Sequence, residues 1–240
     1  MLMSHKAKGL VLLLALTVLI TGSGFSMAWT SVITNGVPWD LYNDSRAVNN
    51  EIEIWNYFTN NGFTPEATAG IMGNMAAESF MNPGQIGLNM SMTNPYTSRG
   101  LIMWTTQANI DHLYSYTGIN SWMDGSLQCS YIASNPNDWV FYPDSTSIAQ
   151  GFPYTWAQFK QLNNVYTASD AFYWEAERPG DGSQGKRQGF AVYFFKTFTG
   201  ADPPTPPPVP PQPPAPTPTP SNFLWLLGGR DVMRRIWFKK

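Results

Sequence analysis

The chain has 240 residues, with 14 basic and 16 acidic side chains and a formal net charge of −2. Charged residues make up only 12% of the sequence while aromatic residues reach 15%, which excludes a wholly disordered, highly charged chain. The single cysteine, Cys129, excludes an intramolecular disulfide and a cysteine-rich zinc site, and two histidines are too few for a histidine-based zinc site. We therefore expect no metal ion and no organic cofactor.

Residues 1–28 have the pattern of a secretory signal peptide. Basic residues precede an apolar run from Leu10 to Ile20, and Ser26-Met27-Ala28 fits a small-x-small cleavage site. The run is short for a membrane span, which needs roughly 20 apolar residues. We expect a cleaved signal or a signal-anchor over 1–28, with a buried core helix as the alternative, and hence a secreted or membrane-anchored protein outside the cytoplasm.

The C-terminal part has two distinct compositions. Residues 203–220 hold 12 of the 20 prolines, which favours a semi-rigid polyproline II linker. Residues 221–240 follow with an apolar, aromatic segment and then five basic residues against one acidic residue, a net charge of +4. We expect this basic amphipathic tail to contact an anionic membrane surface or partner, with a solvated disordered end as the alternative.

The remaining body, 29–202, is long enough for one well-filled core. It carries seven basic and 15 acidic side chains, so its formal charge is −8. An acidic body without basic clusters argues against nucleic acid as a partner. We expect a single catalytic domain that is a monomer.

Helical patterns begin early in the body. Asp44 or Ser45 can cap a helix that ends near Gly62 and carries an apolar stripe of Val48, Ile52, Trp55 and Phe58. Thr64-Pro65-Glu66 then combines a hydroxyl cap, a first-turn proline and an acidic residue, and it predicts a second helix that runs to about Phe80.

The later body continues this pattern. Residues 84–104 are rich in Gly, Asn, Ser and Thr, which predicts loops with a small β-hairpin. Further helices are expected at 104–116, 169–178 and 186–198. The predicted fold class is α+β, predominantly helical.

Nucleophilic catalysis has little support in the sequence. A Cys–His site would need Cys129 with His112, and nothing around Cys129 indicates an activated thiolate. A Ser–His–Asp triad would need the same histidine, and the nucleophile motif G-x-S-x-G does not occur. We interpret Cys129 as a small buried residue and His112 as structural, so any hydrolytic chemistry rests on carboxylates.

Glu78 is the carboxylate that stands out. It lies seven residues after Ile71 and three after Met75, which places it within about 20° of Ile71 on the apolar stripe of the second helix. It is also in the last turn, where the negative end of the helix dipole disfavours a carboxylate. Both effects favour the protonated form that a general acid needs, whereas a glutamate at the helix edge that simply reaches water is the alternative.

Three segments resemble motifs of the phage tail-tip lysozyme family. They are Gly70-Ile-Met-Gly-Asn-Met-Ala-Ala-Glu78-Ser-Phe-Met-Asn-Pro-Gly84, then Gly100-Leu-Ile-Met-Trp104-Thr105, and then Phe172-Tyr-Trp-Glu-Ala-Glu177-Arg178-Pro179 followed by Arg187. The resemblance covers about residues 47–199. It implies a lysozyme-like fold, cleavage of the glycan strands of peptidoglycan, and Glu78 at the position of the catalytic acid.

The resemblance also suggests where substrate binds. We take as candidate contacts Ser79, Trp104, Thr105, Tyr173 and Glu177. Trp and Tyr rings can stack on sugars, while Glu177 has the alternative of a structural ion pair with Arg178. Met103 stands where the family pattern has Gln, and the signal-like segment and proline-rich tail differ from a tail-tip subunit, so a virion location is the weaker alternative to an exported protein.

A retaining lysozyme would place a nucleophilic carboxylate on the segment that follows the helix of the catalytic acid, and this chain has none there. No Asp or Glu occurs between Ser79 and Ile110, so only Asp111, Glu175 or Glu177 could reach the site. The remaining mechanisms are inversion by a bound water and a single-acid route to 1,6-anhydro products, which the resemblance of Glu78 to Pro83 to lytic transglycosylases implies. We favour hydrolysis, with a transglycosylase or a non-catalytic wall-binding or assembly module as alternatives.

Overall fold

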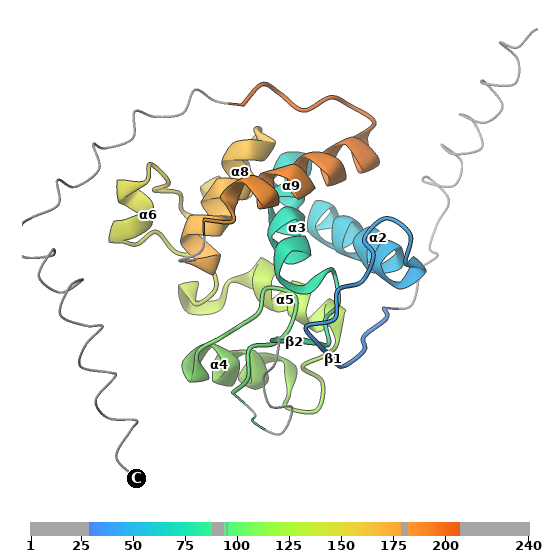
Figure 1. The fold of residues 1–240 in the computed structure, drawn as a ribbon. Helices are drawn as coiled ribbons and strands as arrows, with labels where there is room; N and C mark the ends of the chain where they lie inside the picture. The colour runs from blue at the N-terminus through green and yellow to red at the C-terminus, as the bar shows by residue number, and fades with distance from the viewer. Residues whose placement is uncertain (1–28, 88–93, 95, 179–181, 207–240) are drawn as a thin grey trace, which may run out of the picture. The chain divides into compact units, whose positions relative to one another are not determined.

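The computed structural model describes residues 29–87, 94, 96–178 and 182–206 (Figure 1). Helices dominate this part of the chain, which confirms the α+β, predominantly helical fold class. The chain divides into a unit of residues 1–206 and a second unit of 207–240. The predicted signal, most of the predicted linker and the basic tail therefore lie outside the described residues.

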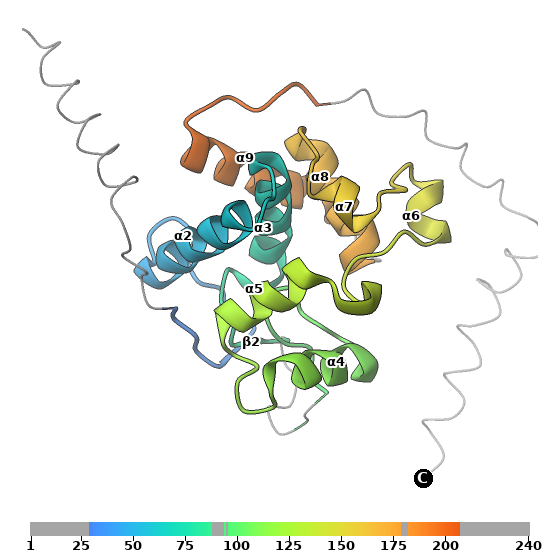
Figure 2. The same cartoon turned by 180° about the vertical axis from the view of Figure 1, so that it is seen from behind.

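Helix α3, Pro65–Ser79, is the central element. Its N-cap Thr64 accepts a hydrogen bond from the Ala67 N–H, and Pro65 occupies the first turn, as the sequence predicted. Ten consecutive residues from 67 to 76 are buried, so the helix is covered on all sides. Figures 1 and 2 show α3 among α2, α8 and α9, all of which it contacts.

Two glycines allow these contacts to be close. A Cβ atom on Gly70 would lie 2.6 Å from the carbonyl carbon of Ala168 in α8, which spans Val165–Phe172. A Cβ atom on Gly73 would lie 2.5 Å from the carbonyl oxygen of Arg187 in α9, which spans Gln184–Thr199. The backbone of α3 therefore approaches both helices to a distance that only glycine permits.

Helix α2, Ser45–Asn60, begins and ends as predicted, with Asp44 as its N-cap, but it buries a different face. Of the predicted stripe only Phe58 is fully buried, and the buried residues are Ala47, Asn50, Glu51, Ile54 and Phe58. Asn50 explains the change, because its side chain accepts a hydrogen bond from the Thr30 N–H at 2.9 Å and donates one to the Met81 carbonyl at 2.8 Å. A hydrogen-bonded polar residue thus occupies the core side of the helix.

The β region forms within the predicted segment 84–104, but it pairs with a strand that was not predicted. Strand β2, Gln85–Ile86, pairs in parallel with β1, Thr34–Asn35, which precedes α2 in the sequence. Antiparallel bridges then join Ile86 to Arg99 and Arg99 to Trp104, so the 84–104 segment folds back on itself. The N-terminal strand thus completes a sheet that the sequence assigned to 84–104 alone.

The second half of the body contains more helices than were predicted. Helices α4, Gln107–Thr117, α8 and α9 correspond to predicted elements, and α8 continues directly into the π-helix η2, Tyr173–Glu177. The unpredicted helices are α5, Gly125–Ser134, the 3₁₀ turn η1, Pro136–Asp138, α6, Ser145–Ala149, and α7, Trp156–Phe159. Within the described ranges, none of these helices is long and apolar enough to cross a membrane.

Candidate active site

Glu78 lies in the last turn of α3, immediately before a sharp exit from the helix. Phe80 and Met81 adopt left-handed backbone angles, with φ of 52° and 62°. Asn82 fixes this exit: its amide donates to the Val32 carbonyl at 2.8 Å and its oxygen accepts from the Gly84 N–H at 3.0 Å. The turn is therefore tied to the N-terminal strand segment, and it holds the end of α3 that carries Glu78.

Arg187 of α9 connects Glu78 to a second carboxylate. Its guanidinium is 2% exposed and forms an ion pair with Glu78, whose side chain is 24% exposed. The same guanidinium donates to Asn74 Oδ1 at 3.1 Å and to Ser183 Oγ at 2.8 Å. A second ion pair joins Arg187 Nη1 to Glu177 Oε1 at 4.0 Å. Glu78 and Glu177, 99 positions apart in the sequence, therefore share one guanidinium.

This arrangement corrects one expectation about charge and extends another. An ion pair with Arg187 replaces the apolar surroundings that Ile71 and Met75 predicted for Glu78. Glu177, for which an ion pair with Arg178 was predicted, forms an ion pair with Arg187. Burial lowers the pKa of Arg178, and the negative charge of Glu177 acts to raise it. Arg178 Nε lies 3.8 Å from Asp144 Oδ2, and the Arg178 guanidinium carbon lies 3.6 Å from the centre of the Tyr142 ring.

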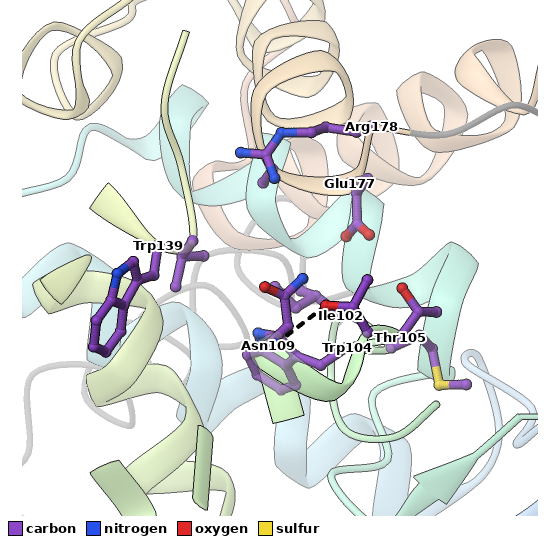
Figure 3. Close-up of a pocket in the computed structure, with 11 residues that line it drawn as sticks. Ile102, Trp104, Thr105, Asn109, Trp139, Glu177 and Arg178 are labelled. Atoms are coloured by element: carbon purple, nitrogen blue, oxygen red, sulfur yellow. Dashed lines mark hydrogen bonds between the residues drawn. The ribbon is translucent and has the colours of Figure 1, made fainter. Parts of the chain in front are cut away.

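A pocket of about 220 Å³ adjoins Glu177. Its walls come from the turn that precedes α4, from the first turn of α4, from the first residues after η1 and from the end of η2 (Figure 3). The lining residues are Ile102, Met103, Trp104, Thr105, Thr106, Asn109, Trp139, Val140, Ala176, Glu177 and Arg178. In Figure 3 the Glu177 carboxylate points toward Ile102 and Thr105, so it faces the opposite wall of the pocket.

The structure brings three of the predicted contact residues together. Trp104, Thr105 and Glu177 all line the pocket, although Trp104 is only 5% exposed. Ser79 and Tyr173 do not line it: Ser79 is buried and donates to the Met75 carbonyl at 3.0 Å, and the buried ring of Tyr173 lies beneath the Arg187 guanidinium. We therefore assign Ser79 and Tyr173 to the support of the site rather than to substrate contact.

Gln128 of α5 joins the pocket wall to the exit of α3. It is fully buried, and its side-chain oxygen accepts from the Leu101 N–H at 2.7 Å. Its amide donates to the Pro83 carbonyl at 2.9 Å. The turn that carries Met103, which has a left-handed φ of 48° and lines the pocket, is thus held against the turn that follows Glu78.

Two of the three candidates for the second catalytic carboxylate, Asp111 and Glu175, do not line the pocket. Asp111 is exposed on α4 and does not line the pocket. Glu175 is buried and accepts from the Tyr154 N–H at 3.0 Å, and burial raises its pKa to about 8. Of the three candidates, Glu177 is the one that shares a partner with Glu78.

Sequence reasoning missed several residues that build the site. Arg187 was noted only as part of a motif, and Gln128, Asn109 and Trp139 were not singled out. Trp139 is 37% exposed and stacks on His112, with ring centres 3.4 Å apart. Cys129 is fully buried, as predicted, and burial raises the pKa of its thiol. Among the described residues, no three His, Cys, Asp or Glu side chains are grouped so as to hold a metal ion.

Comparison with known proteins finds a matching family model and curated relatives. The family model of phage tail lysozymes matches residues 49–198, which include Glu78, Glu177 and Arg187. Morphogenesis protein 1 of Bacillus phage B103 is 30% identical over 149 residues, which are 61% of this chain. The matched region is 38% of that relative, so the chain corresponds to less than half of its length.

Proposed function

Because the chain belongs to the phage tail lysozyme family, we propose that it cleaves the glycan strands of peptidoglycan with Glu78 as the general acid. The observation that supports this proposal is the shared guanidinium of Arg187, which pairs with Glu78 and with Glu177, and of these two carboxylates Glu177 lines the pocket. A glycosidase typically uses two carboxyl groups that flank the bond it cleaves.

In the proposed reaction Glu78 takes up a proton in place of its ion pair with Arg187 when the substrate binds, and it donates that proton to the glycosidic oxygen as the bond to the anomeric carbon breaks. A water molecule attacks that carbon from the opposite face and loses its proton to Glu177. Trp104 and Thr105 contribute the facing wall of the pocket. This assignment makes the reaction an inverting hydrolysis.

A lytic transglycosylase would use Glu78 alone and form a 1,6-anhydro product, so it would not need Glu177 as a base. A wall-binding or assembly module would bind glycan strands without cleaving them. We propose peptidoglycan as the partner in each case, for a monomer that acts on the virion or outside the cytoplasm. Membrane contact through residues 221–240 stays a prediction from the sequence.

The experiment that tests the proposal compares wild type with Glu78→Gln on purified cell walls. The substitution keeps the shape of the side chain but removes the proton, and general acid catalysis contributes roughly 10²–10⁴-fold to the rate. We expect a loss of lysis in that range and a somewhat lower unfolding temperature, because the buried Arg187 guanidinium loses its anionic partner while the amide oxygen can still accept its hydrogen bond. Glu66→Gln, at the other end of α3, is the matched control and should retain lysis. Equal activity of Glu78→Gln and Glu66→Gln would overturn the role of Glu78.

A further inference from the structure

Trp139 is the large aromatic side chain of the pocket that keeps substantial exposure. It is 37% exposed, whereas Trp104 on the facing wall is nearly covered. We propose that the Trp139 indole is the platform on which one N-acetylhexosamine ring of the glycan stacks next to Glu177. The proposal rests on the proposed function and adds a specificity-determining residue to it.

One face of the indole already has a partner. The imidazole of His112, from α4, stacks on it with ring centres 3.4 Å apart and an interplanar angle of 20°. A planar ring has two faces, and Trp139 also lines the pocket. Backing by His112 therefore leaves the indole as a fixed wall for the pocket rather than a freely rotating surface side chain.

The loop that carries Trp139 is built to hold one conformation. Asn135, Asn137 and Asp138 have left-handed φ values of 39°, 52° and 56°, a region that Asn and Asp adopt more readily than other non-glycine residues. The buried side chain of Asn135 accepts from the N–H groups of Val140 and Phe141 at 3.0 and 2.9 Å and donates to the Phe141 carbonyl at 2.7 Å. These bonds close the loop around Trp139.

The opposite side of the pocket provides polar groups. Figure 3 shows Asn109 between Trp139 and the Glu177 side of the pocket, with Arg178 above. A pyranose ring has an apolar face of C–H groups and a rim of hydroxyl and acetamido groups. An indole facing an amide, a carboxylate and a guanidinium matches both parts, because ligand sites combine aromatic walls with a few placed polar groups.

The test measures binding of a soluble GlcNAc–MurNAc tetrasaccharide by calorimetry in the Glu78→Gln background, where the ligand is not consumed. Trp139→Leu keeps apolar bulk without an aromatic face, and we expect roughly tenfold weaker binding. Trp139→Phe keeps an aromatic face and should recover most of the affinity. Tyr116→Ala, which removes a 40% exposed ring of α4 that does not line the pocket, should bind like the parent.

The outcomes separate the two proposals. Stacking on Trp139 would be overturned if Trp139→Leu bound the tetrasaccharide as tightly as the parent. It would also be overturned if Trp139→Phe bound no better than Trp139→Leu. Wall lysis by wild type and Glu78→Gln tests the catalytic proposal independently, because it does not depend on which aromatic ring holds the sugar. Unfolding curves should show that every variant is folded at the temperature of the binding measurement.

Discussion

The guanidinium of Arg187 contacts side chains from three parts of the chain. It donates hydrogen bonds to Asn74 and Glu78 of α3 and to Ser183, the N-cap residue of α9, and it forms an ion pair with Glu177 of η2 at 4.0 Å. Arg187 therefore fixes both proposed catalytic carboxylates by a single set of contacts.

Arg187→Met should destabilise the fold and abolish lysis. Removing one partner of a buried ion pair leaves the others uncompensated, at a cost of about 3–5 kcal/mol for full burial. Because Glu78 is 24% exposed, we expect the lower end of that range, about 3 kcal/mol, in the free energy of unfolding measured with urea.

Two control variants separate charge from geometry at this position. Arg187→Lys retains the charge but has no planar fork, so it should recover part of the stability while lysis stays low. Lys186→Met removes an exposed neighbouring charge of α9 and should change neither. Stability of Arg187→Met equal to that of Lys186→Met would contradict the role of Arg187 as the connection between the carboxylates.

Glu78 could be found from the sequence because its helix signals are local. Thr64 and Pro65 mark the start of α3, and the spacing from Ile71 predicts the buried side of the helix on which Glu78 lies. Its ion pair could not be found this way, because Arg187 follows 109 positions later and the contact depends on how α9 packs on α3. Trp139 was missed for the same reason: its exposure depends on the Asn135 loop.

At the scale of elements, the contact between α3 and α9 carries the site, and Gly73 sets its distance. Gly73→Ala would place a methyl group 2.5 Å from the Arg187 carbonyl oxygen and 2.8 Å from the Ala191 Cβ atom. We expect overpacking to lower the free energy of unfolding by about 1–3 kcal/mol, measured by urea denaturation, and to reduce lysis because Arg187 is displaced.

Gly189→Ala is the matched control, since Gly189 lies inside α9 with no atom within 4 Å of its added Cβ. This substitution should stabilise the protein by about 0.5–1 kcal/mol through helix propensity alone. Destabilisation of similar size by both substitutions would mean that α9 does not pack on α3 at Gly73 as described.

The elements that the sequence predicted are those in which a hydrophobic pattern extends over several turns or a clear N-cap marks the start. Helices α2 and α3, of 16 and 15 residues, show both. Helices α6 and α7, of five and four residues, are too short to show a hydrophobic period, even though Asp144 and Thr155 form capping boxes. The pairing of β1 with β2 joins two residues on each side across 51 positions, so no local pattern predicts it.

At the scale of the whole molecule, three buried acids link stability to pH. Burial raises the pKa of Glu51 to about 7, of Asp170 to about 6 and of Glu175 to about 8. The folded protein therefore keeps protons that the unfolded chain releases at its ordinary, lower pKa values. The stability that these groups contribute is fully present below the unfolded values and is lost as pH rises through the folded values.

We expect the free energy of unfolding to fall between about pH 5 and pH 8, by roughly 1.4 kcal/mol per pH unit for each group inside its window. Glu175→Gln cannot ionise, so its share of the slope should disappear and the variant should gain on wild type toward pH 8. Asp111→Asn, which removes an exposed carboxyl group, is the control. A stability that rises from pH 5.5 to pH 8 in urea titrations would contradict the burial of these acids.

Mass spectrometry of the fragments released from purified peptidoglycan tests the central claim, cleavage of glycan strands by Glu78, most directly. We predict that wild type releases disaccharide-based fragments with hydrolysed, reducing ends and that Glu78→Gln releases almost none. Fragments with 1,6-anhydro ends would retain Glu78 as the acid but contradict the hydrolysis that we assign to Glu177. Intact glycan strands after incubation with wild type, or the same fragments from Glu78→Gln, would contradict the claim itself.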